Sequence, residues 1–166
     1  MATHVMNLFS NSTTLIAAKT VTVASIGLFA GVALSYNAVI MPALKATSNK
    51  NALSVWSNSC RTAKNLQVGL ILTSLIGGST VYYKTENPYF LTGALLMVLN
   101  IPFTFAFIMP INKTLLNIQQ SGKGEESINV LFGRWDILHF GRTLISSIAL
   151  GLTVWGSYSG KSVTLY

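Results

Sequence analysis

The chain has 166 residues, of which 51% are hydrophobic and 9% are charged. Soluble domains carry roughly 25% charged residues, so this composition excludes an ordinary water-soluble domain. The net charge is +7, but the basic residues lie singly between apolar runs and form no basic stripe, which argues against nucleic acid as a partner. The single cysteine, Cys60, excludes an intramolecular disulfide, and we interpret it as a small apolar filler beside a helix.

Four long apolar runs predict an all-α integral membrane protein, a four-helix bundle that forms a single domain over residues 1–166. We expect spans near residues 20–43, 65–83, 88–111 and 137–159, because ~20 apolar residues cross a hydrocarbon core of roughly 30 Å. Residues 1–15 are expected to be loose or to lie at the interface. The first run begins too far from the start, and is too long, for a cleaved signal peptide.

Small residues are frequent inside these runs and predict close packing between helices. In the first run Gly27 and Gly31 form a GxxxG spacing, for which packing inside the bundle is the favoured use. Gly77 and Gly78 lie in the second run.

The segment before the second run has a helical pattern of its own. Leu53, Trp56, Cys60 and Ala63 recur at helical spacing, which predicts a short interfacial helix between spans one and two. Trp56 would then be an anchor at the level of the lipid headgroups.

The distribution of basic residues predicts the orientation in the membrane. Of the eleven Lys and Arg residues, eight lie in or beside the two loops after spans one and three: Lys45, Lys50, Arg61, Lys64, Lys113, Lys123, Arg134 and Arg142. The positive-inside rule places these two loops in the cytosol and both termini in the lumen or outside. The location expected is a eukaryotic endomembrane, where Asn11 begins a glycosylation sequon on the lumenal side.

Polar residues gather at the entry to the fourth span. On a helix, Trp135, His139 and Arg142 fall on one face, and Asp136 lies one turn before His139, within reach of its edge. Ionisable groups in a membrane are costly and usually face the bundle interior or a wet cavity. This stretch is therefore the main candidate for a site.

The alternating directions of the spans bring further polar residues to the same membrane depth. The ends of spans one and three and the start of span four must share one side of the membrane. The residues concerned at the two ends are Tyr36, Asn37, Pro42, Asn100, Thr104, Pro110 and Asn112. Their convergence near His139 predicts a pocket.

Two other interpretations of this cluster stay open. Asp136 and Arg142 can be interfacial charges that pair or snorkel, with His139 as a bridging hydrogen-bond residue. A metal site is a weaker alternative, because one His and one Asp are too few ligands, and we expect no metal.

Several pieces of the sequence resemble the anthrone oxygenase family of small four-span membrane proteins. The matching pieces are Gly31-Val-Ala-Leu-Ser-Tyr-Asn37, Pro42-Ala-Leu44, Pro102-Phe-Thr104, Met109-Pro-Ile-Asn112-Lys-Thr-Leu115 and the spacing WxxxHxxR from Trp135 to Arg142. The resemblance implies oxidation of a flat polyketide or quinol-type substrate by O₂, without a bound cofactor.

The resemblance also implies roles for individual residues. His139 would be the general base, with Asp136 orienting its imidazole or Arg142 stabilising the developing oxyanion. Trp135 would stack on the ring system, and Asn37 and Asn112 would bind its oxygens. Tyr36 and Thr104 complete the expected substrate-binding set.

The competing class is a non-catalytic small membrane subunit, or a lipid-binding protein that packs against partner helices. An enclosed cavity beside His139 favours catalysis, whereas direct contact between Asp136 and Arg142 favours the structural interpretation. The expected partners are membrane lipid and a small aromatic or quinone-like substrate. A homo-oligomer or a larger membrane complex stays open.

Overall fold

The computed structural model describes the backbone of residues 2–159 and the side chains of residues 12–159. In this part of the chain the regular structure is entirely helical. Four stretches of 34 to 37 residues are long and apolar enough to cross a membrane: Ser12–Lys45, Asn49–Thr85, Pro88–Ser121 and Glu125–Ser159. The protein is thus a multi-pass integral membrane protein, which confirms the predicted fold class.

Each span is longer than a bilayer requires, because an α-helix of this length reaches roughly 50 Å. In chain order the described elements are α1 (Ala2–Ser35), η1 (Tyr36–Ile40), α2 (Met41–Lys45), α3 (Asn49–Thr85), α4 (Pro88–Phe103), η2 (Thr104–Ile108), α5 (Met109–Ser121), η3 (Glu125–Ser127) and α6 (Ile128–Ser159). The elements η1 and η2 are π-helical turns, and η3 is a single 3₁₀ turn.

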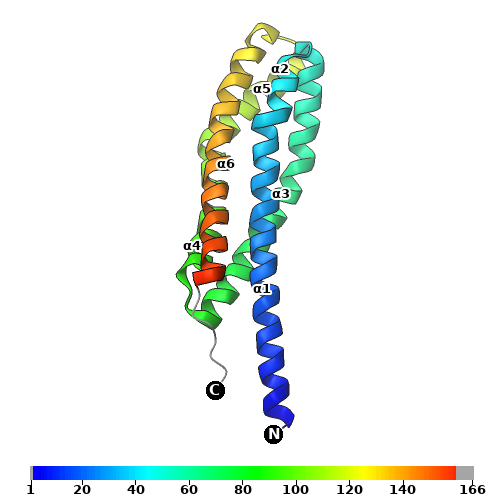
Figure 1. Cartoon of the computed structure of the whole chain (residues 1–166). Coiled ribbons are helices and arrows are strands. Elements are labelled where there is room, and N and C mark those ends of the chain that lie inside the picture. Colours follow the sequence, from blue (N-terminus) through cyan, green and yellow to red (C-terminus); the bar gives the residue numbers. More distant parts are fainter. Residues whose placement is uncertain (1, 160–166) are drawn as a thin grey trace.

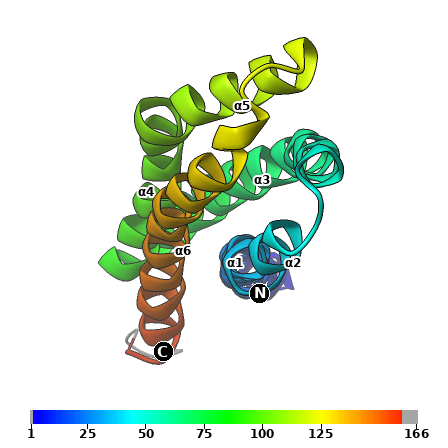
Figure 2. The same ribbon diagram turned by 90° about the horizontal axis from the view of Figure 1, so that it is seen from above.

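The four spans form a bundle in which successive spans run in opposite directions (Figure 1). Both α1 and α4 pack against α3 and α6, whereas α1 and α4 themselves make little contact. The elements α2 and α5 lie at one end of the bundle, where the turns into α3 and α6 also lie (Figure 1). Seen from above, α4 and α5 run in different directions, so the third span bends at η2 (Figure 2).

Both π-helical turns end at the isoleucine of the same tripeptide, Ile-Met-Pro, at residues 40–42 and 108–110. A proline has no N–H, and its ring clashes with the carbonyl four residues earlier, so the regular ladder of hydrogen bonds cannot continue there. The backbone widens instead to bonds between residues five apart: Met41 N–H to Tyr36 O and Met109 N–H to Thr104 O. Such π-helical turns are often found at functional sites.

In the half of the bundle away from these turns, glycines allow the helices to pack closely. A Cβ on Gly78 would lie 2.7 Å from the backbone oxygen of Phe90, and one on Gly93 would lie 2.5 Å from the side chain of Thr153. These glycines let α4 approach both α3 and α6 closely, as expected where packing drives helix association in a membrane. Gly31, in contrast, has nothing within 4 Å of such a Cβ, so the expected use of the GxxxG pair inside the bundle is wrong for it.

The expected short interfacial helix is also wrong. Residues 53–63 belong to the first part of α3, which continues into the second span without a break. Trp56 is therefore no headgroup anchor, because it is only 1% exposed and packs against Trp135 and Phe132. The predicted helical spacing of the apolar residues is confirmed, but this apolar stripe faces the other helices of the bundle.

The N-terminal segment is helical from Ala2 onward, and whether residues 1–15 are loose or lie at the interface stays a prediction. The side chain of Asn11, where glycosylation is expected, lies outside the described residues. Lys161, in the C-terminal segment expected on the lumenal side, also lies outside them.

Candidate functional site

One face of α6 carries the three residues predicted to share it. Trp135, His139 and Arg142 are 3%, 2% and 9% exposed, and all three line the same cavity. The imidazole of His139 lies parallel to the indole of Trp135, with centroids 4.4 Å apart and planes inclined by 14°. The site is thus built on a helix, and its imidazole is held by a neighbour one turn away.

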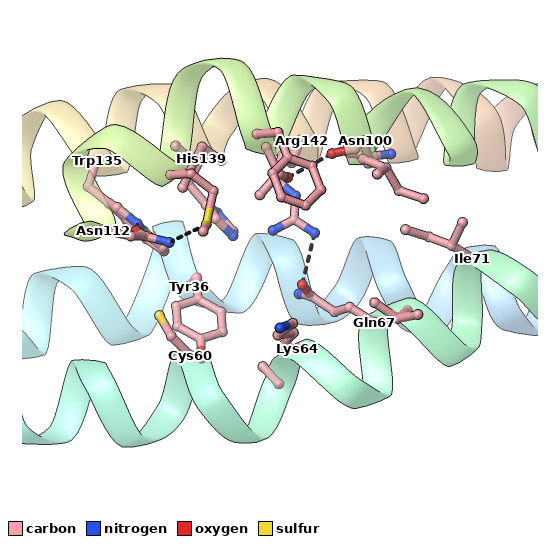
Figure 3. Close-up of a pocket in the computed structure, with 17 residues that line it drawn as sticks. Tyr36, Cys60, Lys64, Gln67, Ile71, Asn100, Asn112, Trp135, His139 and Arg142 are labelled. Atoms are coloured by element: carbon pink, nitrogen blue, oxygen red, sulfur yellow. Dashed lines mark hydrogen bonds between the residues drawn. The ribbon is translucent and has the colours of Figure 1, made fainter. Parts of the chain in front are cut away.

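The cavity has a volume of about 270 Å³, close to the lower end of the range for small-molecule sites. The spans surround it, as the close-up in Figure 3 shows. Besides the three α6 residues, its polar and aromatic lining comprises Tyr36, Cys60, Lys64, Gln67, Asn100, Thr104, Phe105 and Asn112. The structure therefore brings together the residues predicted to converge from spans one, three and four, although Thr104 and His139 lie near the middle of the observed spans and not at their ends.

Two of the expected site residues, Asn37 and Asp136, do not line the cavity. They lie behind the imidazole, between η1 and α6. The Asn37 side chain donates hydrogen bonds to the backbone oxygen and to Oδ1 of Asp136, at 2.9 and 2.7 Å. Its own oxygen accepts one from Thr143 at 2.8 Å and lies 3.4 Å from Nδ1 of His139. Asn37 thus stands between Asp136 and the imidazole.

Asp136 does not orient His139 directly, as one of its expected roles required. Its second oxygen, Oδ2, forms an ion pair with Lys45 at 2.8 Å. The carboxylate also makes no contact with Arg142, so the direct pairing of these two charges, one observation that would have favoured the structural interpretation, is absent from the described residues. Asp136 instead accepts a hydrogen bond from Asn37.

This arrangement defines which nitrogen of His139 is free. An ionised carboxylate and a backbone carbonyl can only accept, so the amide of Asn37 must turn its NH₂ toward Asp136 and its oxygen toward the imidazole. The facing oxygen favours the tautomer with the proton on Nδ1, although 3.4 Å is long for a strong hydrogen bond. Nε2 is then left with the lone pair that a general base needs.

Arg142 is a buried cation without an anionic partner among residues 12–159. One of its terminal nitrogens donates to Oε1 of Gln67 at 2.8 Å, and its guanidinium lies 5.2 Å from the ring centre of Phe29. Its Nε is buried and has no hydrogen-bond partner among the residues that the structure describes. Because an unpaired buried charge is costly, this group marks a place where an anion would be stabilised.

Asn100 offers a second unpartnered atom on the same cavity. Its NH₂ donates to the backbone oxygens of Leu96 and Met97, at 3.2 Å each, while its Oδ1 is buried and has no partner within the described ranges. Figure 3 shows Asn100 and Arg142 beside one another in the lining. Two residues of the lining therefore each carry a buried polar atom without a partner in the described part of the chain, one a donor and one an acceptor.

The remaining expected residues have protein partners. Asn112 accepts a hydrogen bond of 2.8 Å from the indole nitrogen of Trp135, so its oxygen holds this ring in place. The hydroxyl of Thr104 donates to the backbone oxygen of Asn100 at 2.7 Å. The ring of Tyr36 lies 5.4 Å from the imidazole. One face of Trp135 is covered by His139, which leaves less of the indole for stacking on a ligand than was expected.

Sequence reasoning missed Gln67, and it named Asn100 without giving it a role. The signal for both was an amide inside an otherwise apolar run, because such a group must find a partner within the bundle. In the described part of the chain, no three His, Cys, Asp or Glu residues lie close enough together to hold a metal ion.

Comparison with known proteins adds one finding. The family described as anthrone oxygenase matches residues 56–152, more than half of the chain. The match spans most of α3, all of α4 and α5, and most of α6, including the stripe from Trp135 to Arg142. It does not extend to α1 and η1, where the first pieces of the resemblance lie. No curated protein and no solved structure matches the chain.

Proposed function

Because the chain belongs to the anthrone oxygenase family, we propose that it is a membrane oxidase that uses O₂ without a bound cofactor. Its substrate would be a flat, apolar ketone or quinol with an acidic C–H or O–H bond. The observation that carries this proposal is the cavity in which the imidazole of His139 and the unpaired guanidinium of Arg142 meet. These two groups are a base and an anion-stabilising cation.

The proposed reaction begins with proton transfer to Nε2 of His139. Removing a proton from the central CH₂ of an anthrone places the electron pair in an aromatic anion, whose charge resides largely on the former ketone oxygen. Arg142 would stabilise this oxygen, because a fixed cation in a water-poor site acts strongly on developing charge. Asn37, fixed by Asp136, would keep the imidazole in the tautomer that accepts the proton.

O₂ then takes the electron pair from the anion. A C–O bond forms at the former CH₂ carbon, and the peroxide anion receives the proton held by His139. Loss of water from the resulting hydroperoxide, with departure of the remaining hydrogen of that carbon as a proton, gives the quinone carbonyl. The sum is one CH₂ and one O₂ converted into one C=O and one H₂O, so no external reductant is needed.

Oxygen consumption by the purified protein tests this proposal. In detergent or nanodiscs, a panel of anthrones and quinols should include at least one compound that drives O₂ uptake above its own autoxidation, with one O₂ used per quinone formed from an anthrone. A panel that gives no enzyme-dependent uptake, with a folded protein, would contradict the oxidase proposal. The same cavity would then favour the alternative, a protein that binds an acidic lipid at Arg142.

We further propose that the loops after α2 and α5 face the cytosol of a eukaryotic endomembrane. The ion pair between Lys45 and Asp136 lies at this end of the bundle, as do Lys113 and Lys123. The excess of basic residues at one end supports this orientation. The candidate site would then lie in the cytosolic leaflet.

A further inference from the structure

We propose that the cavity takes its ligand from the bilayer, through a mouth between α3 and the bent third span, and that this ligand is an apolar molecule with an acidic oxygen. The inference goes beyond the proposed function, because it does not require that the ligand be oxidised.

The mouth is defined by residues that both line the cavity and face outward. These are Val68 on α3, Ile101 on α4 and Phe105 on η2, which are 43%, 37% and 65% exposed. All three lie within candidate membrane spans. An apolar surface at this depth faces lipid, so the opening that these residues frame leads into the bilayer and not into water.

The opposite wall of the cavity is closed. Trp135, His139 and Arg142 of α6 are buried, and Tyr36 is only 4% exposed. The π-helical turn η2 supplies the exposed Phe105 and the buried Ile108, so the bend of the third span separates the mouth from the inner end. A ligand that enters between α3 and η2 would therefore meet the imidazole and the guanidinium at the far end.

The polar groups of the cavity specify the other half of the ligand. Arg142 is an unpaired cation, and Asn100 has a free acceptor oxygen; both are more than nine-tenths buried and line the cavity. Lys64, one turn from Val68 on α3, adds an exposed cation beside the mouth. The two cations fit a single ionised oxygen, a phenolate, enolate or carboxylate, on an otherwise apolar body, whereas the acceptor oxygen of Asn100 fits a hydrogen-bond donor of the ligand.

Energy transfer to a bound anthracene from the two buried tryptophans, Trp56 and Trp135, provides the test. The protein carries Trp155→Phe to remove the lipid-facing tryptophan and is reconstituted in phosphatidylcholine nanodiscs. The probes are anthracene-9-carboxylic acid and its neutral methyl ester. Saturable transfer to the acid is expected, and Arg142→Gln should weaken the binding of the acid by roughly 10- to 100-fold, the amount typical of a hydrogen bond to a charged group, with little effect on the ester. Absence of saturable transfer, or an equal effect on acid and ester, overturns the ligand class.

The route is tested by kinetics, since equilibrium affinity does not depend on it. The double variant Val68→Phe/Ile101→Phe, which narrows the mouth, should slow association and dissociation of the acid about tenfold, because a steric gate lowers the rate of access. Leu72→Phe is the matched control, since Leu72 lies one turn further on the exposed face of α3 and does not line the cavity. Equal rates in all these proteins would overturn entry from the bilayer.

The source of the ligand is separated by competition. Displacement of the probe by an anthrone supports a polyketide-type ligand, and displacement by palmitic acid alone supports a membrane fatty acid. In the second case the proposed oxidase function fails while the proposed mouth and ligand class stand. If neither compound displaces the probe, both the proposed oxidase function and the proposed ligand class are contradicted.

Discussion

Asn37 and Asp136 are 99 positions apart in the chain, yet their side chains form a hydrogen bond of 2.7 Å. This bond fixes the amide of Asn37 with its oxygen toward His139 and joins η1 to α6 behind the cavity. The carboxylate is held in turn by Lys45. The imidazole is thus positioned by a residue that the ligand need not touch.

Replacing Asn37 by Ala should therefore reduce turnover without weakening substrate binding. We expect kcat to fall by roughly 10- to 100-fold, less than the 10²- to 10⁴-fold contribution typical of a general base, with KM changed by less than about twofold. Steady-state O₂ uptake measures both quantities. Asn117→Ala, at an exposed position on α5, is the control and should leave kcat and KM unchanged. A rise in KM with unchanged kcat would place Asn37 in substrate binding instead.

The substitution Arg142→Gln should reduce turnover without reducing the stability of the protein. Removing a buried charge that has no anionic partner in the described part of the chain relieves its desolvation cost, so we expect the melting temperature in detergent to be unchanged or raised. Turnover should fall by roughly 10²- to 10³-fold, as when an oxyanion donor is removed. Thermal unfolding and O₂ uptake on the same preparation check both statements. A large loss of stability would mean that Arg142 is a structural residue.

Gly78 and Gly69 offer a matched pair of substitutions on α3. Ala at position 78 would bring its Cβ within 2.8 Å of Ala94 and even closer to the backbone of Phe90, so we expect a destabilisation of about 1 to 3 kcal/mol. Ala at position 69 meets nothing within 4 Å and should be neutral or stabilise the helix by up to ~1 kcal/mol. Unfolding in mixed micelles compares the two, and equal effects would contradict the close packing of α3 and α4.

The orientation can be checked with glycosylation acceptors. A sequon inserted in a lengthened loop at Lys123 should stay unmodified in microsomes, whereas one in a lengthened loop at Glu86 should be glycosylated, because these turns lie at opposite ends of the bundle. The reverse pattern would invert the proposed topology.

The four spans could be predicted because lipid imposes one strong rule on the sequence, a long apolar run for each crossing. The shared face of Trp135, His139 and Arg142 followed equally well from helical periodicity, since the helix there is regular. Both the spans and this shared face depend only on residues close together in the sequence. The family resemblance was confirmed over residues 56–152.

What could not be predicted depended on partners far apart in the chain. Trp56 carries the apolar stripe of an interfacial helix, and only the packing against Phe132 and Trp135 shows that it is buried. Asp136 was expected to hold His139 because the two are one turn apart, but Lys45 and Asn37 compete for its oxygens more effectively. Gln67 can be identified as a site residue only from the hydrogen bond that it accepts from Arg142.

The central claim is that His139 is the base of the reaction, and His139→Gln tests it most directly. The variant should still bind anthracene-9-carboxylic acid with an affinity within about threefold of the wild type, since Arg142 holds the acid, and its anthrone-dependent O₂ uptake should fall by roughly 10² to 10⁴, the range for loss of a general base. Wild-type turnover in a variant that binds the probe normally would contradict this account.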